Sequence, residues 1–218
     1  MIRIDHQEPG REQTQERAQD KAQSRPHAAL VVLHGSGGAS RYWLERFAPA
    51  MGRFGMAAYA PHYFDKTGTD RATAEMILDG KHFAQWLAAV KDAITYVAQR
   101  PMVDARRIGV LGISLGGYLA IALAAEDTRV RAAIELSGGM PPGWEDRLSR
   151  ATTPVLVLHG EQDTVVPVSE AHKLAALLQA HRVEHQVELF AGETHWFSAR
   201  AQPRLLMACA TFLGRYLL

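Results

Sequence analysis

The chain has 218 residues, which is enough for one sizeable domain with a single hydrophobic core. Its 24 lysines and arginines balance 23 aspartates and glutamates, so the net charge of +1 gives no reason to expect a nucleic acid or an acidic surface as a partner. A single cysteine, Cys209, excludes an intramolecular disulfide, and no apolar run suits a membrane span or a secretion signal, so we expect a cytoplasmic protein.

The first 27 residues are predicted to form a polar arm. Residues 6–27 contain no Val, Ile, Leu, Met or aromatic side chain, so they can bury little apolar surface by themselves. Residues 1–4 could add a short strand, and residues 14–23 could form a solvated helix. We expect the arm to be a surface extension of the domain that follows.

From residue 28 onward, short apolar runs alternate with segments of helical periodicity. The predicted strands span residues 28–33, 56–60, 108–111, 130–136, 154–158 and 185–190. The predicted helices span residues 41–51, 72–99 with a break near residues 79–80, 118–125, 169–181 and 203–218. This alternation predicts one α/β domain over residues 28–218, with a mostly parallel sheet and helices on both faces. The segment 137–153 is too short for a separate cap domain.

The most informative turn is Gly112-Ile113-Ser114-Leu115-Gly116, which joins a predicted buried strand to a helix rich in small apolar residues. A G-x-S-x-G sequence in this context is typical of a nucleophile elbow, where a sharp turn exposes the serine hydroxyl above the sheet. Glycines two residues before and after the serine remove the Cβ atoms that would collide in such a turn. A glycine-rich turn with an idle serine is the alternative interpretation.

Two later loops offer groups that would activate Ser114. Ligands of open α/β sheets bind beyond the carboxyl ends of the strands, and Asp163 and His195 each follow such an end. Serine is a poor nucleophile until a base takes its proton, histidine suits that role near neutral pH, and a carboxylate orients the histidine. The order Ser114, Asp163, His195 is also the order of α/β-hydrolase triads. Glu161 is the alternative acid.

Two backbone amides are candidates for the oxyanion hole that this chemistry requires. The N–H group of Leu115 would lie at the start of the helix, directly after the serine. The second donor is expected in the glycine loop over residues 34–38, with Ser36 as the candidate. This loop lacks the Lys-Ser/Thr pair of a nucleotide P-loop, and the reaction requires no metal or cofactor.

Four motifs make the chain similar to the dienelactone hydrolase family of α/β-hydrolases from about residue 28 to the last residue. They are YAPHYF at residues 59–64, GISLGG at 112–117, HGEQDTVVP at 159–167 and THWF at 194–197. The resemblance implies an α/β-hydrolase fold without a cap domain, and a carboxylic ester hydrolase. The family also opens with a strand hairpin, which residues 6–27 do not resemble.

Two further departures from the family bear on the chemistry. Dienelactone hydrolase has a cysteine nucleophile where this chain has Ser114, and it has a glutamate that controls the resting thiol where this chain has Gly35. A serine hydroxyl does not need that control, so the absence of the glutamate is consistent with the replacement of the cysteine by serine. The two departures favour a serine esterase branch of the family over a dienelactone substrate.

We therefore predict a serine hydrolase that cleaves small carboxylic esters through Ser114, His195 and Asp163. An acyl-protein thioesterase or lysophospholipase-like carboxylesterase is the alternative enzyme, and a catalytically silent binding protein with this fold is the alternative of another class. Apolar side chains next to the triad could line a substrate site or belong to the core. The candidates are Tyr63, Phe64, Met140, Trp144, Trp196 and Phe197.

The resemblance also implies a site for a substrate carboxylate, which dienelactone hydrolase holds with two arginines. Lys66 and Arg200 stand at the matching places of this chain, although both could be solvated surface cations. The expected partner is a small-molecule ester, with neither nucleic acid nor membrane. Because the strand at 56–60 would lie near a sheet edge, we expect residues 1–27 or a homodimer to cover it.

Overall fold

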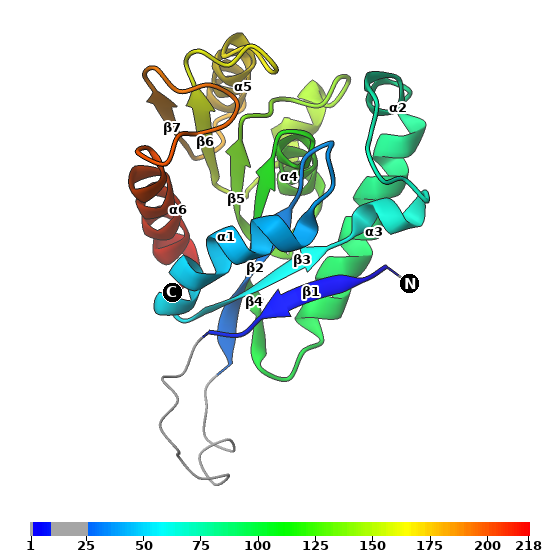
Figure 1. Cartoon of the computed structure of the whole chain (residues 1–218), viewed down its shortest axis with the longest axis vertical. Coiled ribbons are helices and arrows are strands. Elements are labelled where there is room, and N and C mark those ends of the chain that lie inside the picture. Colours follow the sequence, from blue (N-terminus) through cyan, green and yellow to red (C-terminus); the bar gives the residue numbers. More distant parts are fainter. Residues whose placement is uncertain (1, 10–25) are drawn as a thin grey trace, which may run out of the picture.

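The structure is a computed structural model that describes residues 2–9 and 26–218. Its centre is a seven-stranded sheet in the order β1-β3-β2-β4-β5-β6-β7, in which every described strand except β1 runs parallel to its neighbours (Figure 1). The strands are β1 (Ile4–Gln7), β2 (His27–Leu33), β3 (Met56–Pro61), β4 (Val103–Ile113), β5 (Val130–Leu136), β6 (Val155–Gly160) and β7 (His185–Phe190).

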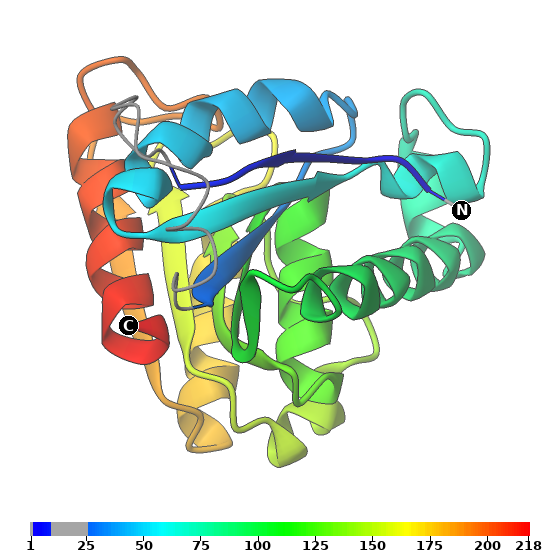
Figure 2. The ribbon, with the colours of Figure 1, turned by 90° about the horizontal axis from the view of Figure 1, so that it is seen from below.

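Helices cover both faces of the sheet, with α1 and α6 on one face and α3, α4 and α5 on the other (Figure 2). The α-helices are α1 (Ser40–Arg53), α2 (Ala74–Leu78), α3 (Lys81–Ala98), α4 (Leu115–Glu126), α5 (Ser169–Ala180) and α6 (Gln202–Leu217). Two short 3₁₀-helices are η2 (Tyr63–Lys66) and η3 (Glu145–Arg150). Because the central strands are buried on both faces, their sequences are continuous apolar runs rather than alternating ones.

The predicted fold class is confirmed, since the sheet is mostly parallel and no cap domain covers it in the described residues. The long helical segment at 72–99 is divided into α2 and α3, with Gly80 at a φ of 67° between them. The strand predicted at 108–111 is longer than expected. It begins at Val103, in a polar stretch that carries Asp104 and Arg106 and therefore shows no apolar pattern.

The N-terminal segment differs from the prediction at its two ends. Ile4–Gln7 forms β1, which pairs antiparallel with β3, and His27 begins β2, so part of the polar arm belongs to the sheet. Backbone pairing with β3 and packing of Ile4 against the core hold β1, and polar contacts add to them, because Arg3 binds Asp65 through two side-chain hydrogen bonds and Asp5 pairs with His62. The helix considered at residues 14–23 lies outside the described residues.

Among the described residues, no helix combines the length and the apolar character that a membrane crossing requires. The same part of the chain holds no group of three or more His, Cys, Asp or Glu side chains arranged to bind a metal ion.

Candidate active site

Ser114 occupies a strained turn between the end of β4 and the start of α4. Its φ of 55° and ψ of −118° lie outside the regions that residues other than glycine ordinarily adopt. Its N–H group donates to the carbonyl oxygen of Leu136 at 2.8 Å, which ties the turn to β5. A Cβ atom at Gly112 would lie 1.8 Å from the carbonyl oxygen of Gly116, so only glycine allows the chain to bend this tightly.

The glycine loop after β2 lies directly against this serine. A Cβ atom at Gly35 would stand 3.2 Å from the Cβ atom of Ser114, so the backbone of the loop reaches the serine where a side chain would not fit well. Ser36 follows, and its carbonyl oxygen accepts a hydrogen bond from Ala72 at 2.8 Å. Leu115 begins α4, and the first amides of a helix lack intrahelical acceptors. The two predicted oxyanion donors are therefore the amide of Leu115, which is next to Ser114, and the amide of Ser36, which is next to Gly35.

Asp163 and His195 are joined by a buried hydrogen bond. The Nδ1 atom of His195 is 2.7 Å from Oδ2 of Asp163, and both side chains are at most 3% exposed. The other carboxylate oxygen, Oδ1, accepts the N–H groups of Val165 and Val166 at 2.8 and 2.9 Å. Glu161, the alternative acid, is exposed. Of the two candidate carboxylates, Asp163 is therefore the one that is hydrogen-bonded to His195.

The two loops that carry these residues are locked together. The N–H group of Gln162 donates to the carbonyl oxygen of Glu193 at 2.9 Å. A Cβ atom at Gly160 would lie 2.5 Å from that same oxygen, so the His195 loop packs on the bare backbone at the end of β6. Neighbouring parallel strands thus bring together residues that are 32 positions apart in the sequence.

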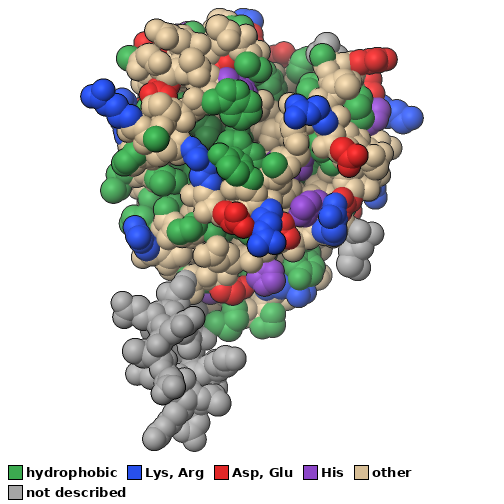
Figure 3. Space-filling view, viewed as in Figure 1, with side chains coloured by type: hydrophobic (Ala, Val, Ile, Leu, Met, Phe, Trp, Pro, Cys, Tyr) green, Lys and Arg blue, Asp and Glu red, His purple; other side chains and the backbone are tan. Residues whose placement is uncertain are grey.

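A small hollow of about 60 Å³, with both polar and apolar walls, connects His195 to the neighbours of Ser114. Its wall includes Ile113, which precedes the serine, and Leu136, which accepts the hydrogen bond of the serine amide. Helices α1 and α6 and the loop after β7 complete the wall with Tyr42, Trp43, Arg46, Trp196, Phe197, Gln202 and Leu205. Trp196 and Tyr42 are 64% and 55% exposed, and Figure 3 shows hydrophobic side chains gathered on this face of the molecule.

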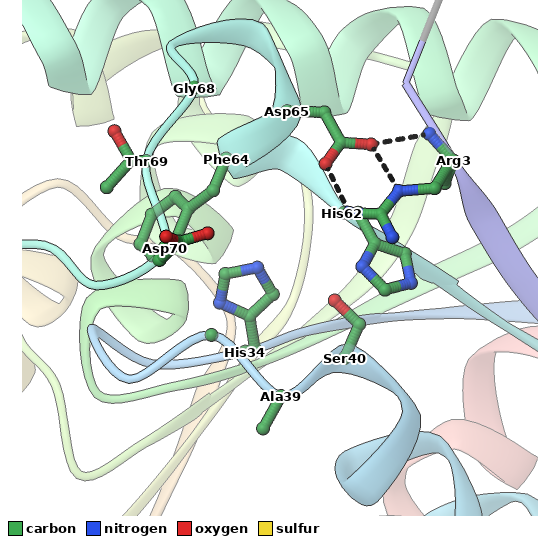
Figure 4. Close-up of a pocket in the computed structure, with 11 residues that line it drawn as sticks. Arg3, His34, Ala39, Ser40, His62, Phe64, Asp65, Gly68, Thr69 and Asp70 are labelled. Carbon is green, nitrogen blue, oxygen red and sulfur yellow. Dashed lines mark hydrogen bonds and ion pairs between the residues drawn. The ribbon is translucent and has the colours of Figure 1, made fainter.

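A larger, polar cavity of about 290 Å³ lies on the other side of the glycine loop. Figure 4 shows His34 projecting into it, with Ser40 at the start of α1 and the Arg3–Asp65 pair opposite. The remaining lining residues are Gly38, Ala39, His62, Phe64, Gly68, Thr69 and Asp70. Ser114, Asp163 and His195 do not line this cavity, so it is separate from the hollow beside His195.

Tyr63 does not fit the expected contact with substrate, because its side chain is fully buried. Its ring stacks on His34 with centroids 3.9 Å apart, and its hydroxyl donates to the carbonyl oxygen of His34 at 2.6 Å. Burial lowers the pKa of His34 to about 4, so this imidazole is neutral at ordinary pH. Tyr63 and His34 therefore support the glycine loop from within the core.

The other predicted substrate residues are dispersed. Trp196 meets the ring of His195 edge-on, with centroids 5.0 Å apart, whereas Trp144 packs against Phe83 of α3 and lines neither of the two cavities. Lys66 on η2 and Arg200 beyond His195 are exposed, and they also line neither.

Sequence reasoning missed Arg71. A Cβ atom at Gly37 would lie 3.8 Å from its Nη2 atom, so the guanidinium group stands over the glycine loop. The signal was weak, because Arg71 lies in an irregular segment between η2 and α2 with no strand end to mark it.

Buried polar groups also lie behind the serine, on β5 and β6. Burial raises the pKa of Glu135 to about 8, although the N–H group of Gly138 donates to its Oε1 atom. Its Oε2 atom, Oγ of Ser137 and Nδ1 of His159 are buried without a hydrogen-bond partner among the described residues. These three groups stand at the carboxyl ends of adjacent strands, beneath the turn that carries Ser114.

Comparisons with known proteins support the fold and identify a family. The sequence model of the dienelactone hydrolase family matches residues 16–211. The carboxymethylenebutenolidase homologs of Pongo abelii and Homo sapiens are each 27% identical over 132 residues, which is 56% of this chain and 52% of each relative. The chain thus spans about half the length of these curated relatives. A solved structure of P91, a dienelactone hydrolase-like promiscuous phosphotriesterase from metagenomic libraries, has a TM-score of 0.77 at 21% identity and covers 91% of this chain and 90% of its own.

Proposed function

The chain belongs to the dienelactone hydrolase family, and from this premise we propose that it hydrolyses small carboxylic esters with Ser114 as the nucleophile. The observation that supports the proposal best is the buried bond between Nδ1 of His195 and Oδ2 of Asp163. That bond leaves Nε2 of His195 as the atom that would take the serine proton. The strained backbone at Ser114 adds to this support, since such strain concentrates at catalytic residues.

In the proposed reaction, Oγ of Ser114 attacks the ester carbonyl while His195 accepts the hydroxyl proton. The amides of Leu115 and Ser36 stabilise the negative charge that develops on the carbonyl oxygen. His195 then gives the proton to the departing alcohol, which leaves an acyl group on the serine. A water molecule, deprotonated by His195, releases the carboxylic acid and restores the serine.

The hollow beside His195 favours a small acyl or alcohol group. A hollow of about 60 Å³ suits a small group such as a methyl or ethyl better than a long chain. Aromatic walls from Trp43 and Phe197 suit an apolar occupant. We therefore expect short-chain esters to be hydrolysed faster than long-chain esters and thioesters, which a lysophospholipase or an acyl-protein thioesterase would prefer.

The first test is the variant Ser114→Ala. We expect kcat for a short p-nitrophenyl ester to fall by several orders of magnitude, because the nucleophile is lost. A fluorophosphonate should label the native protein at Ser114 and leave the variant unlabelled, and equal thermal unfolding of the two proteins would exclude misfolding. Near-normal turnover by Ser114→Ala would overturn the triad. Comparing C2 with C12 esters and with a thioester separates the candidate substrate classes.

The second test addresses a negatively charged substrate, for which Lys66, Arg200 and Arg71 are the candidate cations. Arg71 stands over the glycine loop and can offer a carboxylate two parallel N–H groups. We expect Arg71→Ala to raise KM for an ester with a free carboxylate about tenfold, and to leave KM for its neutral amide analogue within about twofold. Lys66→Ala and Arg200→Ala, tested in the same way, decide whether either of these two cations also holds the carboxylate. An equal effect of Arg71→Ala on both substrates would remove it from the site.

A further inference from the structure

A second histidine contacts the carboxylate that orients His195. His159, at the end of β6, is fully buried, and its Nε2 atom lies 3.3 Å from Oδ2 of Asp163. The same atom lies 2.9 Å from the carbonyl oxygen of Val166. The His159 ring therefore touches both the carboxylate and the turn that follows it.

These contacts define which nitrogen of His159 carries the proton. A carbonyl oxygen can only accept, so Nε2 must be the N–H group, and it points between Val166 and Asp163. The Nδ1 atom has no partner among the described residues, which suits an unprotonated nitrogen better than a buried N–H donor. Burial also lowers the pKa of His159, which keeps the ring neutral.

Val166 links the two sides of this arrangement. Its N–H group donates to Oδ1 of Asp163 while its carbonyl oxygen accepts from His159. Three hydrogen bonds thereby reach the Asp163 carboxylate, from His195 at Oδ2 and from the amides of Val165 and Val166 at Oδ1, and Nε2 of His159 approaches Oδ2 to 3.3 Å. Each donor disperses part of the negative charge that would otherwise face His195.

We propose that His159 is a positioning residue for the ester hydrolysis described above, holding the Asp163 carboxylate in place and moderating its effect on His195. The inference rests on the proposed function, because it assigns His159 a role in that reaction. Without the Nε2–H donor, more of the Asp163 charge faces His195. His195 then becomes more basic, and the carboxylate is free to rotate away from the geometry that proton transfer requires.

Other titratable groups face this cluster from the neighbouring elements. They are Glu135 on β5, Tyr118 on α4 and Glu170 on α5. Glu135 has a pKa of about 8 and Tyr118 a pKa of about 12, so both change charge above the range in which an ordinary histidine titrates. A titration between pH 5 and 7.5 therefore reports chiefly on the histidines.

The test compares His159→Leu, which removes the donor, with His159→Gln, whose side-chain N–H can reach the same acceptors. Leu174→Ala, a core substitution on α5, controls for destabilisation alone. Two measurements are made on each full-length protein. One is the titration of the His195 imidazole by NMR, and the other is the rate at which a fluorophosphonate labels Ser114 as a function of pH.

We expect His159→Leu to move the His195 midpoint upward by about 0.5–1 pH unit and to slow labelling about tenfold on the high-pH plateau. His159→Gln should restore the midpoint and most of the rate, and Leu174→Ala should change neither. A native midpoint and rate in His159→Leu would overturn the proposal, as would a Gln variant as impaired as the Leu variant. If the wild-type protein hydrolyses no ester, the proposed function fails, while the NMR titration still decides whether His159 acts on His195.

Discussion

At the scale of single residues, burial of the Glu135 carboxyl group makes the stability of the folded protein depend on pH. Its carboxyl group is fully buried on β5, and one oxygen has no partner among the described residues. Burial is the main reason that its pKa rises to about 8, with the negative charge of Asp163 adding to the rise. The folded protein therefore takes up a proton at Glu135 that the unfolded chain would release above its ordinary pKa of 4.5.

This proton uptake gives a sign for the pH dependence. Below about pH 4.5, Glu135 is protonated in both the folded and the unfolded state, so its ionisation does not change the free energy of unfolding. Between about pH 4.5 and 8, only the unfolded chain releases the proton, so the free energy of unfolding falls as the pH rises. Above about pH 8, Glu135 is ionised in both states and the free energy of unfolding falls no further on its account. We expect Glu135→Gln to gain stability relative to the wild type as the pH rises from 5 to 9, measured by urea unfolding. Glu145→Gln, at an exposed glutamate on η3, is the control. A pH-independent difference would contradict the assignment.

Among the elements, the turn between β4 and α4 leaves the least room for change. A Cβ atom at Gly116 would lie 2.4 Å from the carbonyl oxygen of Leu33 and 2.6 Å from that of His34, and backbone atoms cannot move aside as a flexible side chain could. The helix begins so close to the glycine loop that one added methyl group would push the two apart.

Gly116→Ala should therefore lower the free energy of unfolding by about 1–3 kcal/mol and also slow the labelling of Ser114. Gly214→Ala is the matched substitution in α6, where a Cβ atom meets nothing within 4 Å. We expect Gly214→Ala to stabilise the protein by about 0.5–1 kcal/mol, because alanine favours a helix more than glycine does. Urea unfolding of both variants provides the check, and equal effects of one sign would contradict it.

Most elements could be predicted from the sequence because burial leaves a strong periodic signal. Strands β5 and β7 have the predicted bounds, residues 130–136 and 185–190, and Gly80 marks the break between α2 and α3. The sequence offered a short strand only at residues 1–4, and the bounds of β1 could not be predicted, because residues 4–7 form no apolar run and are held in part by side chains more than 50 positions away. The candidate site could also be predicted only in part. Ser114, Asp163 and His195 were predictable because each follows the end of a strand. The contact of His159 with Asp163 was not, because it depends on how the folded chain brings the two side chains together.

For the molecule as a whole, β1 closes one edge of the sheet. It pairs with β3 through residues 4–7, so the exposed edge that suggested a homodimer is already covered. The N–H group of His62 also donates to the carbonyl oxygen of Arg3 at 2.9 Å, just beyond the strand. Removing β1 would leave a row of unpaired backbone groups on an apolar strand, which favours pairing with another chain.

Deletion of residues 1–9 should therefore lower the thermal midpoint and produce self-association detectable by light scattering. Arg3→Ala is the control, because it keeps the strand and removes an ion pair whose arginine is 73% exposed and which therefore contributes little. An unchanged midpoint and mass after the deletion would mean that β1 contributes little to the fold.

The chain order of the three proposed catalytic residues has a consequence for synthesis. Ser114 follows the middle strand of the sheet, but its proposed partners follow the last two strands, and His195 comes 81 residues after the serine. A nascent chain emerging from the ribosome would complete the elbow long before His195 becomes available. Reactivity at Ser114 would then appear abruptly once His195 has emerged and docked, which makes labelling of this serine a sensitive reporter of the folding of this domain.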